Sequence, residues 1–172
     1  MEKLKAYIRD IPDFPKKGII YKDITPLLAH AESLQLAVTE LAKPFLNLNI
    51  TAVAGMEARG FIFGSLVAAE LNVGFIPFRK PGKLPADVES VSYSLEYGEA
   101  TLEVHRDAIK QGDKILLVDD LLATGGTAKA SCQLVEKLGG DIVGCAFVIE
   151  LSFLDGKKQL ADTFVHSLIQ YS

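Results

Sequence analysis

The sequence is poor in features that define several classes of protein. Its 172 residues include only two cysteines, Cys132 and Cys145, at no metal-ligand spacing. We therefore expect neither a disulfide framework nor a zinc site, and both thiols should pack as small hydrophobic groups. No stretch approaches the roughly 18 consecutive apolar residues of a membrane span, so no membrane partner is expected. The charged start, MEKLKAYIRD, contains no signal-peptide core, and a cytoplasmic location is favoured.

Positive charge is scarce as well. Lys and Arg number 18 against 22 Asp and Glu, which gives a net charge of −4. Because proteins dedicated to nucleic acids usually carry a basic face, no nucleic-acid partner is expected, although a local basic pocket is compatible with this total. The length and the 49% hydrophobic composition indicate a single globular domain over residues 1–172, which needs no disulfide or metal to hold its core.

Helical spacing and short apolar runs alternate along the chain. Helices are predicted at 2–9, 26–47 (one or two helices, since the pattern breaks near 30–32), 59–72 and 125–140. Strands are predicted at 50–55, 74–78, 114–119 and 141–151, with a loop at 79–90 and a hairpin formed by 90–97 and 100–107. This order predicts an α/β fold with a mainly parallel sheet flanked by helices. The segment IPDFPKKGIIYKDITP has three prolines in 16 residues and predicts an irregular hood over residues 1–25.

The stretch ILLVDDLLATGGT, residues 115–127, combines an apolar strand, two aspartates and a glycine turn that leads into a helix. A helix N-terminus offers free N–H groups to an anion, and glycine lets the backbone approach it closely. Neither G-x-x-x-x-G-K-[ST] nor G-x-G-x-x-G is present, so a single terminal phosphate, such as a sugar 5′-phosphate, fits best. Asp119 and Asp120 are expected at the strand end, where they would accept hydrogen bonds from vicinal sugar hydroxyls. The alternative, that one aspartate caps the helix, leaves the second unexplained.

Two further segments could bind anions. AGMEARG, residues 54–60, is a strand end followed by a helix start, and Arg59 adds a planar fork suited to phosphate oxygens. The alternative is a surface pair between Arg59 and Glu57. RKPGKLP, residues 79–85, carries Arg79, Lys80 and Lys83 in a loop that could close over a leaving group and exclude water. Its alternative is a solvated charged loop.

The motif VDDLLATGGT resembles the phosphoribosyl-diphosphate motif of the type I phosphoribosyltransferases. With DFPKKGIIYKDITPLL, GMEARGFIFG, RKPGKLP and YSLEYG in the same order, the resemblance narrows to the adenine-specific members and covers residues 7–171. It implies the type I phosphoribosyltransferase fold and the conversion of adenine and phosphoribosyl diphosphate to AMP and diphosphate, a step of purine salvage. It also implies Mg²⁺, reached through substrate and water, and a homodimer.

The resemblance also implies roles for individual residues. The 5′-phosphate would be bound by Ala123, Thr124, Gly125, Gly126 and Thr127, and the ribose hydroxyls by Asp119 and Asp120. The diphosphate would meet Glu57, Ala58 and Arg59, with Arg79, Lys80 and Lys83 in the lid. Glu96, beside Tyr97, would relay a proton at adenine N7, with Glu103 as the competing carboxylate. Backbone groups near Ile20 and Lys22 would read the adenine edge while Ile20 packs on its face.

Some residues are predicted to stay outside the chemistry. Lys22 stands where many relatives of that family carry arginine. Recognition of adenine by the Lys22 backbone would not depend on this difference, whereas recognition by its side chain would. Phe14 is expected in the core, and His30, His105 and His166 are expected to be structural. Three alternatives stay open: an enzyme of the same fold for another base, a regulator that binds phosphoribosyl diphosphate without catalysis, and a generic α/β domain.

Overall fold

A central parallel sheet organises the molecule. The structure is a computed structural model that describes residues 2–94 and 98–172. Five strands form the sheet in the order β4-β3-β7-β8-β9. Their bounds are β3 (Ala52–Met56), β4 (Gly74–Phe78), β7 (Lys114–Leu122), β8 (Asp141–Leu151) and β9 (Val165–Tyr171). All four pairings are parallel, so the predicted α/β fold with a mainly parallel sheet is confirmed.

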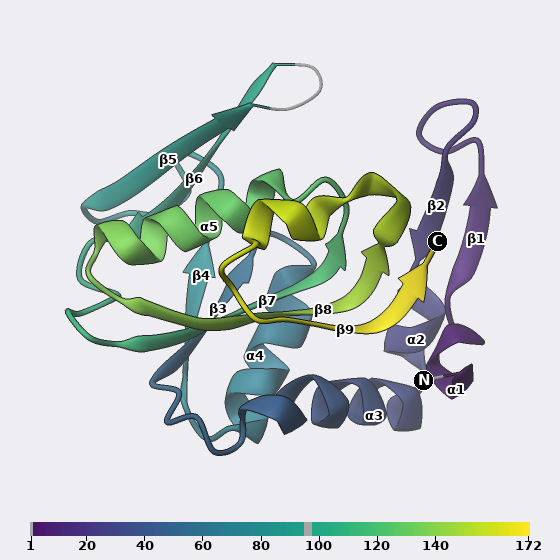
Figure 1. Ribbon diagram of the computed structural model, residues 1–172, viewed down its shortest axis with the longest axis horizontal. Coiled ribbons are helices and arrows are strands. Elements are labelled where there is room, and N and C mark those ends of the chain that lie inside the picture. Colours follow the sequence, from purple (N-terminus) through teal and green to yellow (C-terminus); the bar gives the residue numbers. More distant parts are fainter. Residues whose placement is uncertain (1, 95–97) are drawn as a thin grey trace.

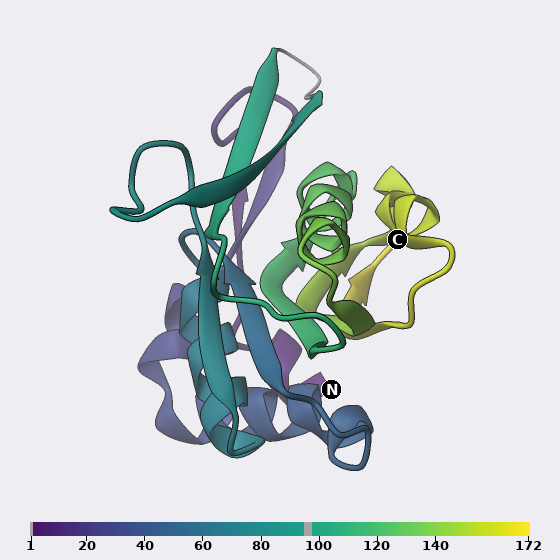
Figure 2. The same cartoon turned by 90° about the vertical axis from the view of Figure 1, so that its left-hand side faces the viewer.

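Helices cover both faces of this sheet (Figures 1 and 2). One face carries α3 (Ala31–Ala42) and α4 (Gly60–Glu70); the other carries α5 (Gly126–Lys137) and the hairpin of β5 (Val88–Ser94) and β6 (Glu99–His105). Successive side chains of β7 point to opposite faces of the sheet and pack against the helices on each face. Ile115 and Leu117 pack on the α5 side, whereas Leu116 and Val118 pack on the α3 and α4 side. All four are fully buried, as expected for a central strand covered on both faces.

The N-terminal segment is more regular than predicted. The helix expected at 2–9 is only α1 (Glu2–Lys5), and the irregular hood is an antiparallel ribbon of β1 (Arg9–Pro12) and β2 (Ile20–Asp23). Charge pairs between opposite residues hold the ribbon: Arg9 with Asp23 at 2.6 Å and Asp10 with Lys22 at 2.7 Å. The intervening turn contains the cis Phe14–Pro15 peptide, so this proline interrupts no strand.

The remaining elements follow the predicted order. The region 26–47 contains two helices, α2 (Thr25–Ala29) and α3, and His30 between them caps α3 by accepting from the Ser33 N–H. Short 3₁₀ turns occur at η1 (Lys43–Phe45), η2 (Ser152–Leu154) and η3 (Gly156–Leu160). The sequence patterns predicted neither these turns nor β9. Among the described residues, no helix has the length and apolarity to cross a membrane.

The strand order reverses between β3 and β7. From β3 the chain moves to β4 on one side and returns to β7 on the other, so the carboxyl ends of β3 and β7 lie next to each other. In open parallel sheets such a switch point forms the ligand crevice. The loop before α4 and the loop before α5 both begin here, and the ribbon and the β5–β6 hairpin project toward the same side of the molecule in both views (Figures 1 and 2).

Candidate active site

The loop between β7 and α5 forms a small cradle. It encloses a cavity of about 180 Å³, and the five residues predicted to bind a 5′-phosphate all line it. Gly125 precedes α5 in the left-handed region, at φ 84°, where only glycine sits without strain. The first backbone N–H groups of α5 have no intrahelical acceptor, as at every helix start, so they are available to an anion. The predicted residues are therefore brought together at one cavity.

A second backbone segment supports this cradle from behind. A Cβ atom on Gly125 would lie 2.3 Å from the carbonyl oxygen of Gly156, and one on Gly156 would lie 2.0 Å from the carbonyl oxygen of Ala123. Both contacts are backbone to backbone, so neither can relax by turning a side chain. Lys129 on α5 also donates to Gln159 at 3.1 Å. Sequence reasoning missed Gly156, because a lone glycine 31 positions away carries no sign of this contact.

Asp119 and Asp120 lie inside β7 rather than at its end, which corrects the prediction. The strand continues through Leu122 because the apolar Leu121 and Leu122 keep pairing with β8 beyond the two charges. Asp119 lines the cavity, and its Oδ1 accepts from the Asp120 N–H at 2.8 Å. Asp120 is buried, with 4% of its surface exposed. The alternative of a helix-capping aspartate is wrong, since Gly125 caps α5 without any side-chain hydrogen bond.

The two carboxyl groups have perturbed acidities. Burial raises the pKa of Asp119 well above its ordinary value, and the neighbouring charge of Asp120 raises it further. Burial also raises the pKa of Asp120, while the Arg59 guanidinium acts in the opposite direction. Asp120 Oδ2 forms an ion pair with Arg59 Nε at 3.0 Å, and within residues 2–94 and 98–172 no group makes a hydrogen bond to this buried oxygen. It can still accept a hydrogen bond from a ligand at the sheet switch point.

Arg59 connects the N-terminal ribbon to this pair. Its Nη1 donates to the Tyr21 hydroxyl on β2, and its guanidinium carbon lies 5.4 Å from the Tyr21 ring centroid. Its Nε faces Asp120 at the ion-pair distance given above. The alternative in which Arg59 pairs with Glu57 is therefore wrong. Ala58 lies between them, in the loop before α4, and the Glu57–Ala58 peptide is cis.

Glu57 instead holds the start of the predicted lid. Its Oε1 accepts from the Lys83 ammonium, its Oε2 accepts from the Lys80 N–H at 2.9 Å, and Arg79 Nε lies 3.4 Å away. The hydrogen bond from Lys83 is the largest of the effects that lower the pKa of Glu57. Glu103, the carboxylate weighed against Glu96, accepts from the Gly82 N–H at 3.0 Å. The lid cations Arg79 and Lys83 thus meet an anion, unlike those of a freely solvated loop.

The three ribbon residues considered in the sequence, Ile20, Lys22 and Phe14, differ in their exposure and contacts. Ile20 is 55% exposed and free to pack on a ligand. The Lys22 ammonium is engaged with Asp10 and lies 3.8 Å from the Tyr171 ring centroid, so only its backbone remains for recognition. Phe14 is 50% exposed and contacts Tyr21 edge-on, which contradicts the expectation that it belongs to the core. The ribbon turn carries Phe14 away from the sheet.

The remaining predicted residues are Glu96, Tyr97 and the three histidines. Glu96 and Tyr97 lie outside the described residues. The histidines make structural contacts: His30 caps α3, His105 Nε2 accepts from the Ala86 N–H, and His166 Nε2 contacts the Glu40 carbonyl.

Cys132 and Cys145 are buried with their sulfurs 4.0 Å apart. Within residues 2–94 and 98–172, no cluster of three or more His, Cys, Asp or Glu could hold a metal.

Comparison with known proteins gives consistent matches over nearly the whole chain. The profile of the phosphoribosyl transferase domain family matches residues 24–169. Adenine phosphoribosyltransferase from Nitrosococcus oceani is 65% identical over 99% of this chain and 100% of that protein. The crystal structure of adenine phosphoribosyltransferase from Thermoanaerobacter pseudethanolicus superposes with a TM-score of 0.96 at 51% identity, covering 99% of each chain. The Saccharomyces cerevisiae enzyme, crystallised with adenine and an imino-altritol bisphosphate, gives 0.92 at 37% identity, covering 97% of each chain.

Proposed function

We propose that this chain, which belongs to the phosphoribosyltransferase family, transfers the phosphoribosyl group of 5-phosphoribosyl 1-diphosphate to adenine. The products are AMP and diphosphate, and the reaction salvages a purine base. One observation carries the proposal: the phosphate cradle and the two adjacent carboxyl groups of Asp119 and Asp120 meet at the switch point between β3 and β7. A sugar that bears a terminal phosphate and vicinal hydroxyls matches both parts of that site.

The cradle residues 123–127 would bind the 5′-phosphate through backbone N–H groups and the hydroxyls of Thr124 and Thr127. The ribose would then lie beside β7, where Asp119 and Asp120 would accept hydrogen bonds from its 2′- and 3′-hydroxyls. Asp120 Oδ2, which faces Arg59 Nε in the free protein, would gain a hydrogen bond from one of these hydroxyls. Two carboxylates held here would also stabilise positive charge on the ribose ring as the reaction proceeds.

The chemistry is a displacement at C1′ of the ribose. A new bond forms between adenine N9 and C1′, the bond from C1′ to the diphosphate oxygen breaks, and the diphosphate leaves with that electron pair. Arg79 and Lys83 would exchange Glu57 for the leaving diphosphate, with Lys80 beside them. Ile20 and the backbone beside Lys22 would orient adenine, and Glu96 next to Tyr97 would take the proton that adenine loses. Alignment of two reactants can lower a barrier by about 7–11 kcal/mol at best, and electrostatic preorganisation supplies the rest.

Mg²⁺ fits this arrangement through its preference for oxygen ligands. Asp119 at the cavity and the buried Asp120 supply such oxygens next to the ribose position, and would hold the ion through substrate hydroxyls or water. When bound, Mg²⁺ would neutralise charge on the diphosphate. A homodimer and a cytoplasmic location are further parts of the proposal, and light scattering of the purified chain would test the first.

A base panel tests the activity directly. The protein is incubated with Mg²⁺, phosphoribosyl diphosphate and, in separate reactions, adenine, hypoxanthine, guanine, xanthine or orotate, and the products are weighed by mass spectrometry. AMP from adenine alone is the expected result. Another nucleotide would retain the phosphate and ribose assignments and reject the adenine site at Ile20 and Lys22. Tight binding of phosphoribosyl diphosphate without any nucleotide would favour a regulator and remove Glu96 from the catalytic residues.

A further inference from the structure

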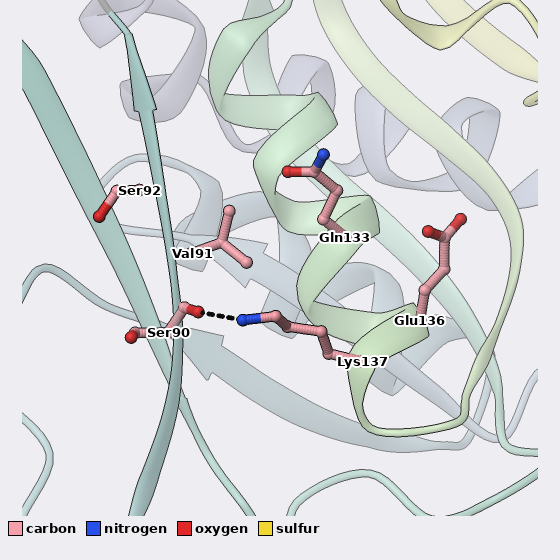
Figure 3. A pocket seen from close by; sticks show the side chains of 6 residues that line it. All are labelled: Ser90, Val91, Ser92, Gln133, Glu136 and Lys137. Atoms are coloured by element: carbon pink, nitrogen blue, oxygen red, sulfur yellow. Dashed lines mark hydrogen bonds between the residues drawn. The ribbon is translucent and has the colours of Figure 1, made fainter.

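The β5–β6 hairpin is attached to α5 at two separate points. At the end away from the cradle, Lys137 donates to the Ser90 carbonyl at 2.9 Å (Figure 3). Its ammonium also pairs with Glu89 at 3.3 Å. Between strand and helix lies a cavity of about 640 Å³, lined by Ser90, Val91, Ser92, Gln133, Glu136 and Lys137. Lys137 therefore holds the hairpin near Ser90, and β5 meets α5 again beyond this cavity.

That second contact is made by Tyr93 at the cradle. The Tyr93 hydroxyl lies 3.1 Å from Oγ1 of Thr127. The ring rests on the first residue of α5, since a Cβ atom on Gly126 would have the Tyr93 ring as its nearest neighbour, at 3.4 Å. Tyr93 is partly buried and packs against the hydrophobic cluster under the hairpin. A side chain from another element thus touches two successive residues of the cradle.

We propose that Tyr93 is a positioning residue that aims the Thr127 hydroxyl at the 5′-phosphate. Thr127 is the second residue of α5, so no preceding helical turn offers its hydroxyl a carbonyl, and its χ1 can take more than one staggered rotamer. A hydrogen bond from Tyr93 selects one of them. The inference rests on the proposed function for the identity of the ligand, a sugar phosphate, and on the two distances above for its geometry.

The direction of the hydrogen bonds follows from the ligand. A phosphate dianion only accepts, so Thr127 must donate its single hydroxyl proton to the phosphate oxygen. The Thr127 hydroxyl oxygen can then only accept in its contact with Tyr93. The Tyr93 hydroxyl must therefore donate its proton to Thr127 Oγ1. The chain Tyr93 O–H to Thr127 O–H to phosphate is polarised in one direction, which strengthens each member. Phenylalanine at position 93 would keep the ring on Gly126 and lose only this donor.

A double-mutant cycle with Tyr93→Phe and Thr127→Ala tests the proposal. The affinity for ribose 5-phosphate is measured by calorimetry, and the KM values for phosphoribosyl diphosphate and adenine by initial rates. We expect Tyr93→Phe to weaken ribose 5-phosphate binding about three- to tenfold, as a single hydrogen bond does, and to leave the KM for adenine unchanged. In the Thr127→Ala background the same change should have no further effect, because Tyr93 acts only through Thr127.

Ser92→Ala is the matched control. It removes a hydroxyl from the neighbouring position of the same strand, but that hydroxyl bonds to Thr101 across the hairpin at 2.8 Å. Its ribose 5-phosphate affinity should equal that of the unsubstituted protein. A shift as large as that of Tyr93→Phe would mean that the hairpin, rather than the aimed hydroxyl, is responsible, and would overturn the proposal.

Three other results would also overturn it: no binding of ribose 5-phosphate to the unsubstituted protein, unchanged affinity in Tyr93→Phe, or an undiminished effect in the Thr127→Ala background. Binding of ribose 5-phosphate requires no adenine and no turnover. A coupled loss of binding in a protein that makes no AMP would therefore support the role of Tyr93 while rejecting the proposed reaction. AMP formation with no coupling between Tyr93 and Thr127 would do the reverse.

Discussion

The two loops at the switch point occupy equivalent places in the fold but are built from different kinds of residue. Each follows a strand of the central sheet and precedes a helix, β3 to α4 in one case and β7 to α5 in the other. The first loop works with long charged side chains: Glu57 holds Lys83, and Arg59 lies between Tyr21 and Asp120. The second loop consists of small residues whose backbone is locked against Gly156.

This difference matches the two ends of the proposed substrate. The 5′-phosphate stays attached to the ribose throughout the reaction, and a rigid backbone cradle suits a group whose bonds do not change. The diphosphate must arrive, lose its bond and leave. Side chains that already have an intramolecular partner can exchange it for a ligand and return, whereas a locked backbone cannot.

Asp119→Asn should have the largest effect, because this carboxylate belongs to the site that both loops share. We expect kcat to fall about 100-fold or more, the usual loss when a preorganised electrostatic contact to the transition state is removed. The measurement is steady-state kinetics with adenine and phosphoribosyl diphosphate. A loss below threefold would show that Asp119 is not part of the ribose site.

The same substitution should stabilise the unliganded protein at neutral pH. The pKa of Asp119 is raised in the folded state, mainly by burial, so the folded protein binds more protons than the unfolded chain between the ordinary and the raised pKa. Stability therefore falls as pH rises through that window, and asparagine avoids the loss. Thermal unfolding from pH 4 to pH 8 should show an advantage for Asp119→Asn that grows with pH. An advantage independent of pH would contradict burial as its cause.

Gly125→Ala tests the locked backbone of the second loop. The new Cβ would meet the Gly156 carbonyl at 2.3 Å in a residue at φ 84°, so we expect a loss of stability above the roughly 1–2 kcal/mol of left-handed strain alone, together with loss of ribose 5-phosphate binding. Gly112→Ala is the control, since Gly112 has φ 82° and nothing within 4 Å of the added atom. Equal losses of stability in the two variants would remove the contact with Gly156 from the explanation.

Glu57→Gln tests whether the first loop holds exchangeable charges. Lys83 and Arg79 would no longer have to leave a carboxylate, so diphosphate should bind up to about fivefold more tightly, in line with the strength of a partly exposed ion pair. Calorimetry with diphosphate measures this change. Glu103→Gln, which alters a carboxylate that holds the Gly82 N–H, should leave the affinity unchanged. Weaker binding in Glu57→Gln would mean that Glu57 preorganises the cations instead.

Tyr21→Phe should have the smallest effect, about a twofold rise in the KM for phosphoribosyl diphosphate. Arg59 loses one acceptor, but its side chain is 39% exposed and water replaces part of the bond. Tyr7→Phe serves as the comparison, since the Tyr7 hydroxyl bonds to His30 away from the crevice. If both variants behave alike in initial-rate measurements, Arg59 is held by Asp120 alone.

Local patterns predicted most of the sheet because each buried strand is a contiguous apolar run. The ribbon of β1 and β2 was missed because its stabilising pairs, Asp10 with Lys22 and Arg9 with Asp23, are charged and give no apolar alternation. The end of β7 was placed too early because two charges inside a buried strand look like its end. The contact of Asp120 with Arg59 and the hydrogen bonds proposed to the ribose hydroxyls explain why Asp119 and Asp120 lie inside the strand.

The candidate site shows the same division. The cradle could be predicted because its five residues are consecutive, so their spacing alone places them at one helix start. The Gly156 contact, the Tyr21–Arg59 bond and the Tyr93–Thr127 bond join residues from 31 to 38 positions apart in sequence. Their geometry is set by how the sheet and helices pack, and no short motif carries that information.

The position of Arg59 has a thermodynamic consequence. One guanidinium touches both the ribbon, through Tyr21, and the carboxylate of Asp120. A base that shifts Tyr21 would change how firmly that cation is held against Asp120, and a sugar hydroxyl that binds Asp120 would change how firmly it is held against Tyr21. Linkage requires these two influences to be equal: whatever factor adenine imposes on the affinity for the sugar phosphate, the sugar phosphate imposes on the affinity for adenine.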